Sequence, residues 1–317
     1  MDKDHIYKKW VLDVTSNDIG SLLVEDSVVC LDLETFGLVP EEGIILQIGG
    51  HHMRYSTFEN MGSFAEYVRL TPELMDRLEC EVLSDCEPGH ESVHWMLMYG
   101  HYLGSFIKSS GRKKTVIRER PDGVSHFKYT YEVPVKMEPQ DLPEFKKKVG
   151  DLRTEGDILQ DFFYNFLDKS ETKIIVGHNI YDFDRVFLNK RCTLLGMDRT
   201  LGDNYHYVDT MWVCRFNIVP ALLYLKDLHN ELGTSVLLRL SKDGRISSSQ
   251  DDLRKIFCPS VGGVSHSAEV DAEVSLHLLK GFQGFYVHFA DILNGSTDYL
   301  NLVRMMYGKH KGDGFNY

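Results

Sequence analysis

The sequence predicts an α/β domain, and three observations support this fold class. An apolar, β-prone run that begins at Val28 indicates a buried strand. Two further strand-like runs, residues 43–49 and 54–58, follow after short connections, which favours an antiparallel meander over parallel crossovers. Between residues 157 and 209 the pattern alternates helix, strand, helix and strand, which is typical of an α/β layer.

Composition and length bound the class of protein. The 317 residues suit one large domain or one domain with insertions, and 43% apolar and 11% aromatic residues are ordinary for a globular protein. No apolar run approaches the ~20 residues that span a bilayer, and the N-terminus lacks a signal-peptide pattern. We therefore expect a cytoplasmic protein with no membrane contact. The six cysteines show no zinc-ligand spacing, which indicates free thiols.

The net charge of −12 argues against a protein that coats polyanions in general. It does not exclude a nucleic-acid enzyme, because a site built from carboxylates is itself acidic and basic patches can be local.

The first half of the chain mixes predicted helices with a hairpin. Residues 1–25 indicate a short helical or irregular segment, and residues 63–107 are mostly helical by pattern. Within them, residues 72–78 form a helix for which Thr71 is a plausible N-cap. Residues 137–150 are expected to form a connector.

The second half supplies the remaining elements of the α/β layer. Strands are predicted at residues 173–177 and 205–209. Apolar spacing predicts the helices, which are residues 157–167, 181–195, 222–232, 248–257, 268–282, 285–293 and 298–306. The Gly- and Lys-containing tail, residues 308–317, is expected to be flexible.

A basic β-hairpin is predicted near residues 114–134. Two alternating runs flank the turn at Pro121, Asp122 and Gly123, and the surrounding segment is rich in Lys and Arg. A hairpin face with cations and aromatic rings suits single-stranded nucleic acid. A solvated hairpin whose aromatic residues pack on the body of the protein is the alternative.

Asp32 and Glu34 interrupt the apolar run at the end of the first strand. Residues i and i+2 of a strand point to the same face, so the two carboxylates repel each other and resist desolvation. A hard divalent cation would remove that conflict. Two solvated acids in a turn after Leu31 are the alternative from this stretch alone.

Two later stretches place acids and histidines at predicted helix starts. One runs from His178 to Asp184, directly after the strand that ends at Gly177. The other runs from His266 to Asp271. A His five residues ahead of an Asp, on a loop that enters a helix, lets both side chains reach one point in space.

These stretches together resemble the DEDDh subclass of the DEDD-type 3′→5′ exonucleases, the superfamily of exonuclease I, proofreading exonucleases and oligoribonuclease. Asp32-Leu33-Glu34-Thr35-Phe36-Gly37 matches the first motif, Asp-x-Glu-Thr-x-Gly. The stretch from Asn179 to Asp184 matches the second, Asn-x-x-x-Phe-Asp, and His266, Ala268 and Asp271 match the third, His-x-Ala-x-x-Asp. The ordered set is more specific than any single motif.

The resemblance implies a ribonuclease-H-like fold, with a mixed five-stranded sheet flanked by helices. It covers roughly residues 27–62 and 155–283. It leaves residues 63–154 as a helical insertion with the β-hairpin, inside a single exonuclease domain of residues 1–317.

The resemblance also implies the site. Asp32, Glu34, Asp184 and Asp271 would bind two Mg²⁺ or Mn²⁺ ions, and His266 would be the general base, because its unperturbed pKa of ~6.5 suits that role. A shorter register of the second motif would select Asp182, but Phe183 before Asp184 favours Asp184.

Residues beside the acids are expected to contact the terminal nucleotide of the substrate. They are Thr35, Phe36, Gly37 and Asn179. Phe36 would stack on a base, with packing in a core as its alternative. Asp209 could support the site or simply end its strand, and His178 is expected to be structural.

The function implied is a metal-dependent 3′→5′ exonuclease that releases nucleoside monophosphates from single-stranded ends. The exonuclease-I-like form of the first two motifs favours DNA as the polymer. A 3′→5′ exoribonuclease or oligoribonuclease is the first alternative, and a non-catalytic nucleic-acid-binding module is the second. The sequence does not indicate a protein partner.

Overall fold

The computed structural model describes residues 26–83, 108–119, 126–135, 139–228, 241–242, 245–259, 261 and 267–293. Several predicted features lie outside the described residues: the N-terminal segment, the helix of residues 298–306, the tail and His266.

The chain divides into two compact units. The first contains Met1–Glu34, Gln47–Glu66 and Leu159–Tyr317, and the second contains Thr35–Leu46 and Tyr67–Ile158. Most of the predicted insertion, from residue 67 to residue 154, falls in the second unit.

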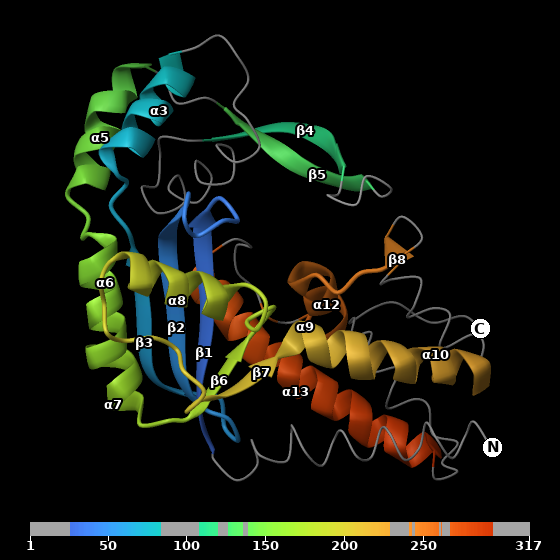
Figure 1. The fold of residues 1–317 in the computed structure, drawn as a ribbon. Helices are drawn as coiled ribbons and strands as arrows, with labels where there is room; N and C mark the ends of the chain where they lie inside the picture. Colours follow the sequence, from blue (N-terminus) through green and yellow to red (C-terminus); the bar gives the residue numbers. More distant parts are fainter. Residues whose placement is uncertain are drawn as a thin grey trace. The chain divides into compact units, whose positions relative to one another are not determined.

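A five-stranded sheet is the framework of the fold, with the order β3-β2-β1-β6-β7 (Figure 1). Its strands are β1 (Ser27–Phe36), β2 (Ile44–Arg54), β3 (Glu59–Tyr67), β6 (Ile174–Gly177) and β7 (His206–Asp209). β1 pairs in parallel with β6, and β6 in parallel with β7. The connections from β1 to β2 and from β2 to β3 are too short for parallel crossovers. The predicted mixed five-stranded sheet is confirmed.

The third strand differs from its prediction. Residues 54–58 were expected to form it, but β2 continues to Arg54 and a turn leads into β3 at Glu59. β3 is mostly exposed and polar, so it lacks the apolar alternation by which an edge strand is recognised.

Helical segments cover both faces of the sheet. Successive residues of a strand point to opposite faces, and two glycines of β2 show what lies on each side. A Cβ on Gly49 would meet Ala268 of α13 (Ala268–Leu293) at 2.1 Å. A Cβ on Gly50 would meet Phe166 of the π-helical segment η2 (Phe162–Leu167) at 2.8 Å.

The α13 side of the sheet carries a large apolar core. Val28 and Cys30 of β1 join Ile174 and Val176 of β6 in this cluster. It also contains residues of α10 (Val219–Leu228), α12 (Gln250–Phe257) and α13. The predicted helices of residues 268–282 and 285–293 are one continuous helix, because Phe282, Phe285 and Phe289 keep helical spacing and are buried.

The remaining elements of the first unit connect and flank the sheet. They are α7 (Asp168–Ser170), α8 (Asp184–Leu194), α9 (Thr210–Val213), the π-helical segment η3 (Cys214–Ile218), β8 (Ser241–Lys242) and β9 (Arg245–Ile246). α6 (Glu155–Asp161) spans the boundary between the two units.

The second unit contains the predicted hairpin and two helices. β4 (Lys108–Glu119) pairs antiparallel with β5 (His126–Val135), so the hairpin is confirmed and its strands extend beyond residues 114–134. α3 (Pro72–Leu83) begins where expected.

Residues 142–150 were expected to be a connector, but they form α5 (Leu142–Gly150), preceded by the short 3-10 helix η1 (Pro139–Asp141). Three residues of α5 have helical spacing and are buried: Leu142, Phe145 and Val149. The neighbouring lysines make this apolar pattern hard to recognise in the sequence.

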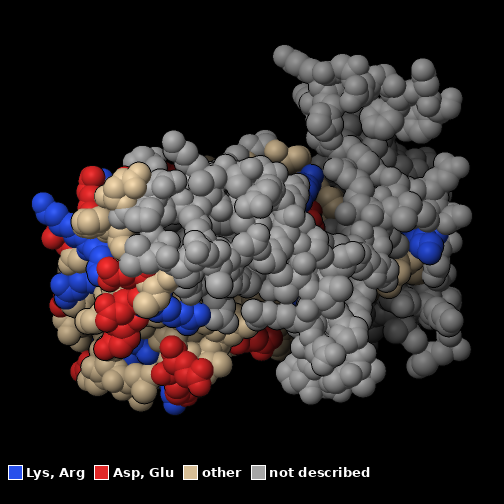
Figure 2. All heavy atoms as spheres, turned by 90° about the horizontal axis from the view of Figure 1, so that it is seen from above, with Lys and Arg blue, Asp and Glu red and all other residues tan. Residues whose placement is uncertain are grey.

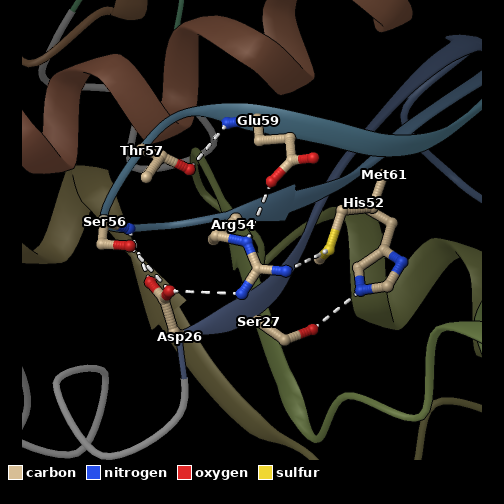
Figure 3. A network of polar contacts seen from close by, with 8 residues as sticks. All are labelled: Asp26, Ser27, His52, Arg54, Ser56, Thr57, Glu59 and Met61. Carbon is tan, nitrogen blue, oxygen red and sulfur yellow. Dashed lines mark hydrogen bonds and ion pairs between the residues drawn. The ribbon is translucent and has the colours of Figure 1, made fainter.

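Polar contacts fasten the start of β1 to the end of β2 (Figure 3). Asp26 accepts hydrogen bonds from the backbone N–H and the Oγ of Ser56, each at 2.6 Å. Arg54 lies 3.7 Å from Asp26, and Ser27 Oγ is 2.7 Å from His52 Nε2. The ion pair is exposed and adds little stability, so the bonds to Ser56 are the main constraint.

Charged side chains of both signs are interspersed on the described part of the face in Figure 2. In the second unit, Lys146 pairs with Glu79 at 2.7 Å and Lys148 with Glu144 at 3.2 Å. Among the residues that the structure describes, no helix is both long enough and apolar enough to cross a bilayer.

Candidate active site

The face of β1 that packs on α13 changes from apolar to acidic along the strand. Val28 and Cys30 are fully buried in the core, and the next two residues on that face are Asp32 and Glu34. Glu34 is 7% exposed and Asp32 is half-buried. The two acids therefore belong to the strand, and the alternative of two solvated turn residues is wrong.

Asp271 meets these two acids from the first turn of α13. One carboxylate oxygen from each of Asp32, Glu34 and Asp271 can be chosen so that all three lie within 4.8 Å of one another. Asp271 is 9% exposed, and its backbone N–H donates to the carbonyl of Ser267 at 2.8 Å. The helix backbone thus orders the residue that carries this carboxylate.

Asp184 reaches the same region from the start of α8. β1 and β6 are parallel, so the loop after β6 emerges at the edge where β1 carries its acids. The Oδ1 of Asp184 accepts a hydrogen bond from the backbone N–H of Leu33 at 3.0 Å, and Asp184 is 2% exposed.

Asp182, the alternative acid of the second motif, lies elsewhere. It is exposed, and its Oδ2 accepts a hydrogen bond from Trp212 Nε1 at 3.1 Å. The structure thus places Asp184, and not Asp182, beside β1.

Burial and mutual repulsion perturb the carboxyls. Burial raises the pKa of Asp32 well above its ordinary value, and the charges of Asp184, Glu34 and Asp271 raise it further. Burial also raises the pKa of Asp184 to about 7, although the N–H of Leu33 opposes the shift. In the absence of a cation, the cluster resists full ionisation at neutral pH.

This donor set fits divalent metal ions. Mg²⁺ and Mn²⁺ prefer carboxylate oxygens, and three such oxygens converge here. A bound cation would favour the ionised carboxylates that burial and repulsion disfavour. Asp32, Glu34 and Asp271 are the residues best placed to hold it, with Asp184 beside them.

Three residues of β2 contact the start of α13, and the sequence did not predict this role for them. The side-chain oxygen of Gln47 accepts a hydrogen bond from the N–H of Ala268 at 3.0 Å. His51 Nε2 is 2.9 Å from the carbonyl oxygen of Glu269. Gly49 lets the helix start approach the strand closely. Their partners lie more than 200 residues away in the chain, so no local pattern marks them.

The loop before Asp184 is held by Asp209, which caps α9. Asp209 Oδ1 accepts from the N–H of Asn179 at 3.0 Å, and Oδ2 from the N–H of Tyr181 at 3.1 Å. Asn179 adopts a left-handed φ of 68°, which Asn tolerates better than most residues. Asp209 is therefore a support for the loop rather than only a strand-end acid.

His178 is bound into the same region. Its Nδ1 lies 2.9 Å from Thr210 Oγ1. Burial lowers its pKa to about 4, with a further effect from Arg215, so the imidazole is neutral. These contacts fit the structural role expected for it.

Thr35, Phe36 and Gly37 belong to the second unit. Thr35 Oγ1 donates to the carbonyl of Gly37 at 2.8 Å, and Gly37 has a φ of 78°. Phe36 is 8% exposed within an apolar cluster, with the Arg77 guanidinium 5.1 Å from its ring centroid. Phe36 is thus packed in a core, which is the alternative to base stacking.

Comparison with known proteins finds solved structures of distant similarity. No family model matches the chain, and no curated protein matches it. Among solved structures, the nuclease domain of 3′hExo, a DEDDh family member bound to rAMP, shares 12% identity at a TM-score of 0.37; the match covers 85% of this chain and 93% of that one.

A second structure shows 3′-end-specific recognition of a histone mRNA stem-loop by a 3′-exonuclease. It shares 12% identity at a TM-score of 0.35, over 85% of this chain and 83% of that one.

Proposed function

We propose that this protein is a divalent-metal-dependent 3′→5′ exonuclease that releases nucleoside monophosphates from single-stranded nucleic acid. The convergence of Asp32, Glu34 and Asp271, with oxygens within 4.8 Å of one another, carries the proposal. Carboxylates held this close together repel one another, and a bound divalent cation would offset that repulsion.

The four acids of the site are proposed to bind the metal ions. Asp32, Glu34, Asp184 and Asp271 would hold two Mg²⁺ or Mn²⁺ ions. When bound, the ions would lower the pKa of the attacking water and neutralise charge on the leaving 3′-oxygen. Leu33 and the first turn of α13 keep Asp184 and Asp271 in place through backbone hydrogen bonds.

His266 is proposed as the general base that takes the proton of the attacking water. It lies outside the described residues, so its role rests on the third motif, in which it stands five residues before Asp271. Asn179, on the loop that leads to Asp184, is proposed to contact the terminal nucleotide.

DNA is proposed as the preferred polymer, on the form of the first two motifs, with RNA as the alternative. The test is to incubate 5′-labelled single-stranded DNA and RNA with the protein and Mg²⁺ or Mn²⁺. We expect ladders that shorten from the 3′ end, faster for DNA, and no cleavage with EDTA.

Asp32→Ala is the matched control for this test. An exonuclease should lose cleavage in this variant and can keep its binding of the polymer. Faster degradation of RNA would select the alternative polymer. No degradation of either polymer by the unaltered protein would contradict the proposal and favour a binding module.

A further inference from the structure

A row of four aromatic rings, two of them exposed, borders the loop that carries Asp184. Trp212 of α9 and Phe216 of η3 are one helical turn apart, with ring centroids separated by 5.5 Å. The Trp212 ring lies 5.1 Å from Tyr181, and Tyr181 lies 5.9 Å from Tyr207. We call these four residues the aromatic row.

The outer rings of the row are open to solvent. Trp212 is 40% exposed and Phe216 is 54% exposed. Large aromatic side chains gain much from burial, so two adjacent exposed rings point to a binding surface. Both lie on the helical stretch that Asp209 caps.

The row is also held in place before any ligand binds. The indole N–H of Trp212 donates to Asp182, and Asp209 Oδ1 accepts from the backbone N–H of Trp212 at 3.2 Å. The hydroxyl of Tyr181 donates to the carbonyl of Tyr207 at 3.0 Å. Pre-ordered rings lose little conformational entropy when a planar ligand stacks on them.

Cations stand beside the aromatic row. Tyr181 also lines an open groove of about 430 Å³ on α8, whose other lining residues are Arg185, Val186, Asn189, Lys190 and Thr193. The guanidinium of Arg185 lies 4.6 Å from the centroid of the Tyr207 ring. Its ion-pair partner, Asp203, is 95% exposed, so a phosphate could compete with that pair.

We infer that the aromatic row and the α8 groove bind the single strand upstream of its 3′ terminus. Bases would stack on Trp212 and Phe216, and phosphates would lie near Arg185 and Lys190. Aromatic platforms beside cations are the usual means of holding single strands without sequence preference. The row is continuous with the loop of Asp184, since Tyr181 stands three residues before it. This inference rests on the proposed function.

The test measures binding as a function of strand length. Asp32→Ala protein, in EDTA to prevent hydrolysis, is titrated with labelled DNA and RNA strands of two and twelve nucleotides. Adding Trp212→Ala and Phe216→Ala should weaken binding of the twelve-nucleotide strand by ~5- to 150-fold for each stacked base. Binding of the two-nucleotide strand should not change, because it does not reach the row.

Two further variants sharpen the comparison. Tyr164→Ala removes an aromatic residue of similar exposure, 47%, that lies on η2, and it should leave both affinities unchanged. For the twelve-nucleotide strand, the binding constant K falls with salt concentration, and Lys190→Gln should reduce the slope of log K against log salt by about 0.7. That is the value for one phosphate contact on a single strand. Thermal unfolding of each variant checks that the fold is retained.

The outcomes separate this inference from the proposed function. If the unaltered protein degrades strands but the Trp212→Ala/Phe216→Ala protein binds both lengths as the parent does, the inference is overturned and the exonuclease stands. An equal loss for both lengths also overturns it. If the unaltered protein neither binds nor cleaves strands of any length, the proposed function fails and the inference fails with it.

Discussion

The backbone N–H of Leu33 donates to Oδ1 of Asp184 at 3.0 Å, across 151 positions of sequence. Leu33 stands between Asp32 and Glu34, so this bond fixes the acid of α8 against the strand that carries two others. Because the donor is a backbone group, the bond depends on the acceptor at position 184 and not on the side chain at position 33.

Replacing Asp184 with Asn should separate the effect of its negative charge from the effect of its hydrogen bond to Leu33. Asn keeps a side-chain oxygen for the N–H of Leu33 but cannot supply a negative charge. If Asp184 is a metal ligand as proposed, we expect cleavage to fall on the order of 10³-fold, because such a ligand contributes several kcal/mol of transition-state stabilisation. Stability without metal should rise, since a buried repelling charge is removed.

Asp182→Asn is the matched control, because Asp182 is exposed and bonds Trp212 instead. Steady-state cleavage rates and thermal unfolding in EDTA measure both effects. A larger loss of cleavage in Asp182→Asn than in Asp184→Asn would contradict the placement of the second motif.

Gly49→Ala should displace the start of α13 and, with it, Asp271. The added Cβ would meet the carbonyl carbon of Ala268 at 2.1 Å, so strand or helix must move. We expect a loss of stability of about 1–3 kcal/mol, typical of overpacking, and weaker binding of Mg²⁺ or Mn²⁺. Urea unfolding and a metal titration measure the two effects.

Gly156→Ala, in helix α6, provides the comparison. Nothing lies within 4 Å of a Cβ at Gly156 of α6, so this change should be neutral or should stabilise by up to about 1 kcal/mol. If Gly49→Ala behaves like Gly156→Ala, then α13 is not held closely against β2.

Without metal, the acid cluster should make the protein less stable as pH rises. The pKa of Asp32 is raised in the folded state and that of Asp184 is raised to about 7, so the folded protein holds more protons than the unfolded chain above pH ~4. Stability from these groups is therefore present at low pH and decreases as pH rises towards about 7.

Urea unfolding in EDTA at several pH values between 5 and 7.5, for the parent and Asp184→Asn, isolates this contribution. The parent should lose more stability than the variant as pH rises, and saturating Mg²⁺ should reverse the difference. Parallel pH profiles for the two proteins in EDTA would show that Asp184 ionises normally.

Asp32 and Glu34 could be singled out because they interrupt an apolar strand. Asp184 and Asp271 stand at helix starts, where acids are common, so only the motifs of the resemblance marked them as site acids. Gln47 could not be predicted, and for Asp209 the sequence left support of the site and a strand end as alternatives, because the hydrogen-bond partners of both residues are set by tertiary packing.

The misplaced elements have similarly physical causes. β3 is a polar edge strand with little apolar alternation. The apolar stripe of α5 has only three residues, and lysines lie among them in the sequence. The proline in its first turn is compatible both with a helix start and with a connector. Pairing with β2 decides the structure of β3, and burial of the apolar side chains decides that of α5; local propensity decides neither.

His178 should make the fold sensitive to acid. Burial lowers its pKa in the folded state to about 4, whereas the unfolded value is ~6.5. As pH falls below ~6.5, the unfolded chain takes up a proton that folded His178 excludes, so the stability that this group contributes is lost between pH ~6.5 and about 4. The loss can reach about 3 kcal/mol, from 1.36 kcal/mol for each pKa unit.

His178→Gln removes the titration while keeping a polar group near Thr210, and His206→Gln removes an exposed histidine of β7 as a control. The stability of the parent relative to His178→Gln, from urea unfolding, should fall as pH is lowered from 7 to 4.5. The same measurement on His206→Gln gives the reference profile for the loss of an exposed histidine. A constant difference for His178→Gln would mean that His178 is protonated in the folded protein as readily as in the unfolded chain.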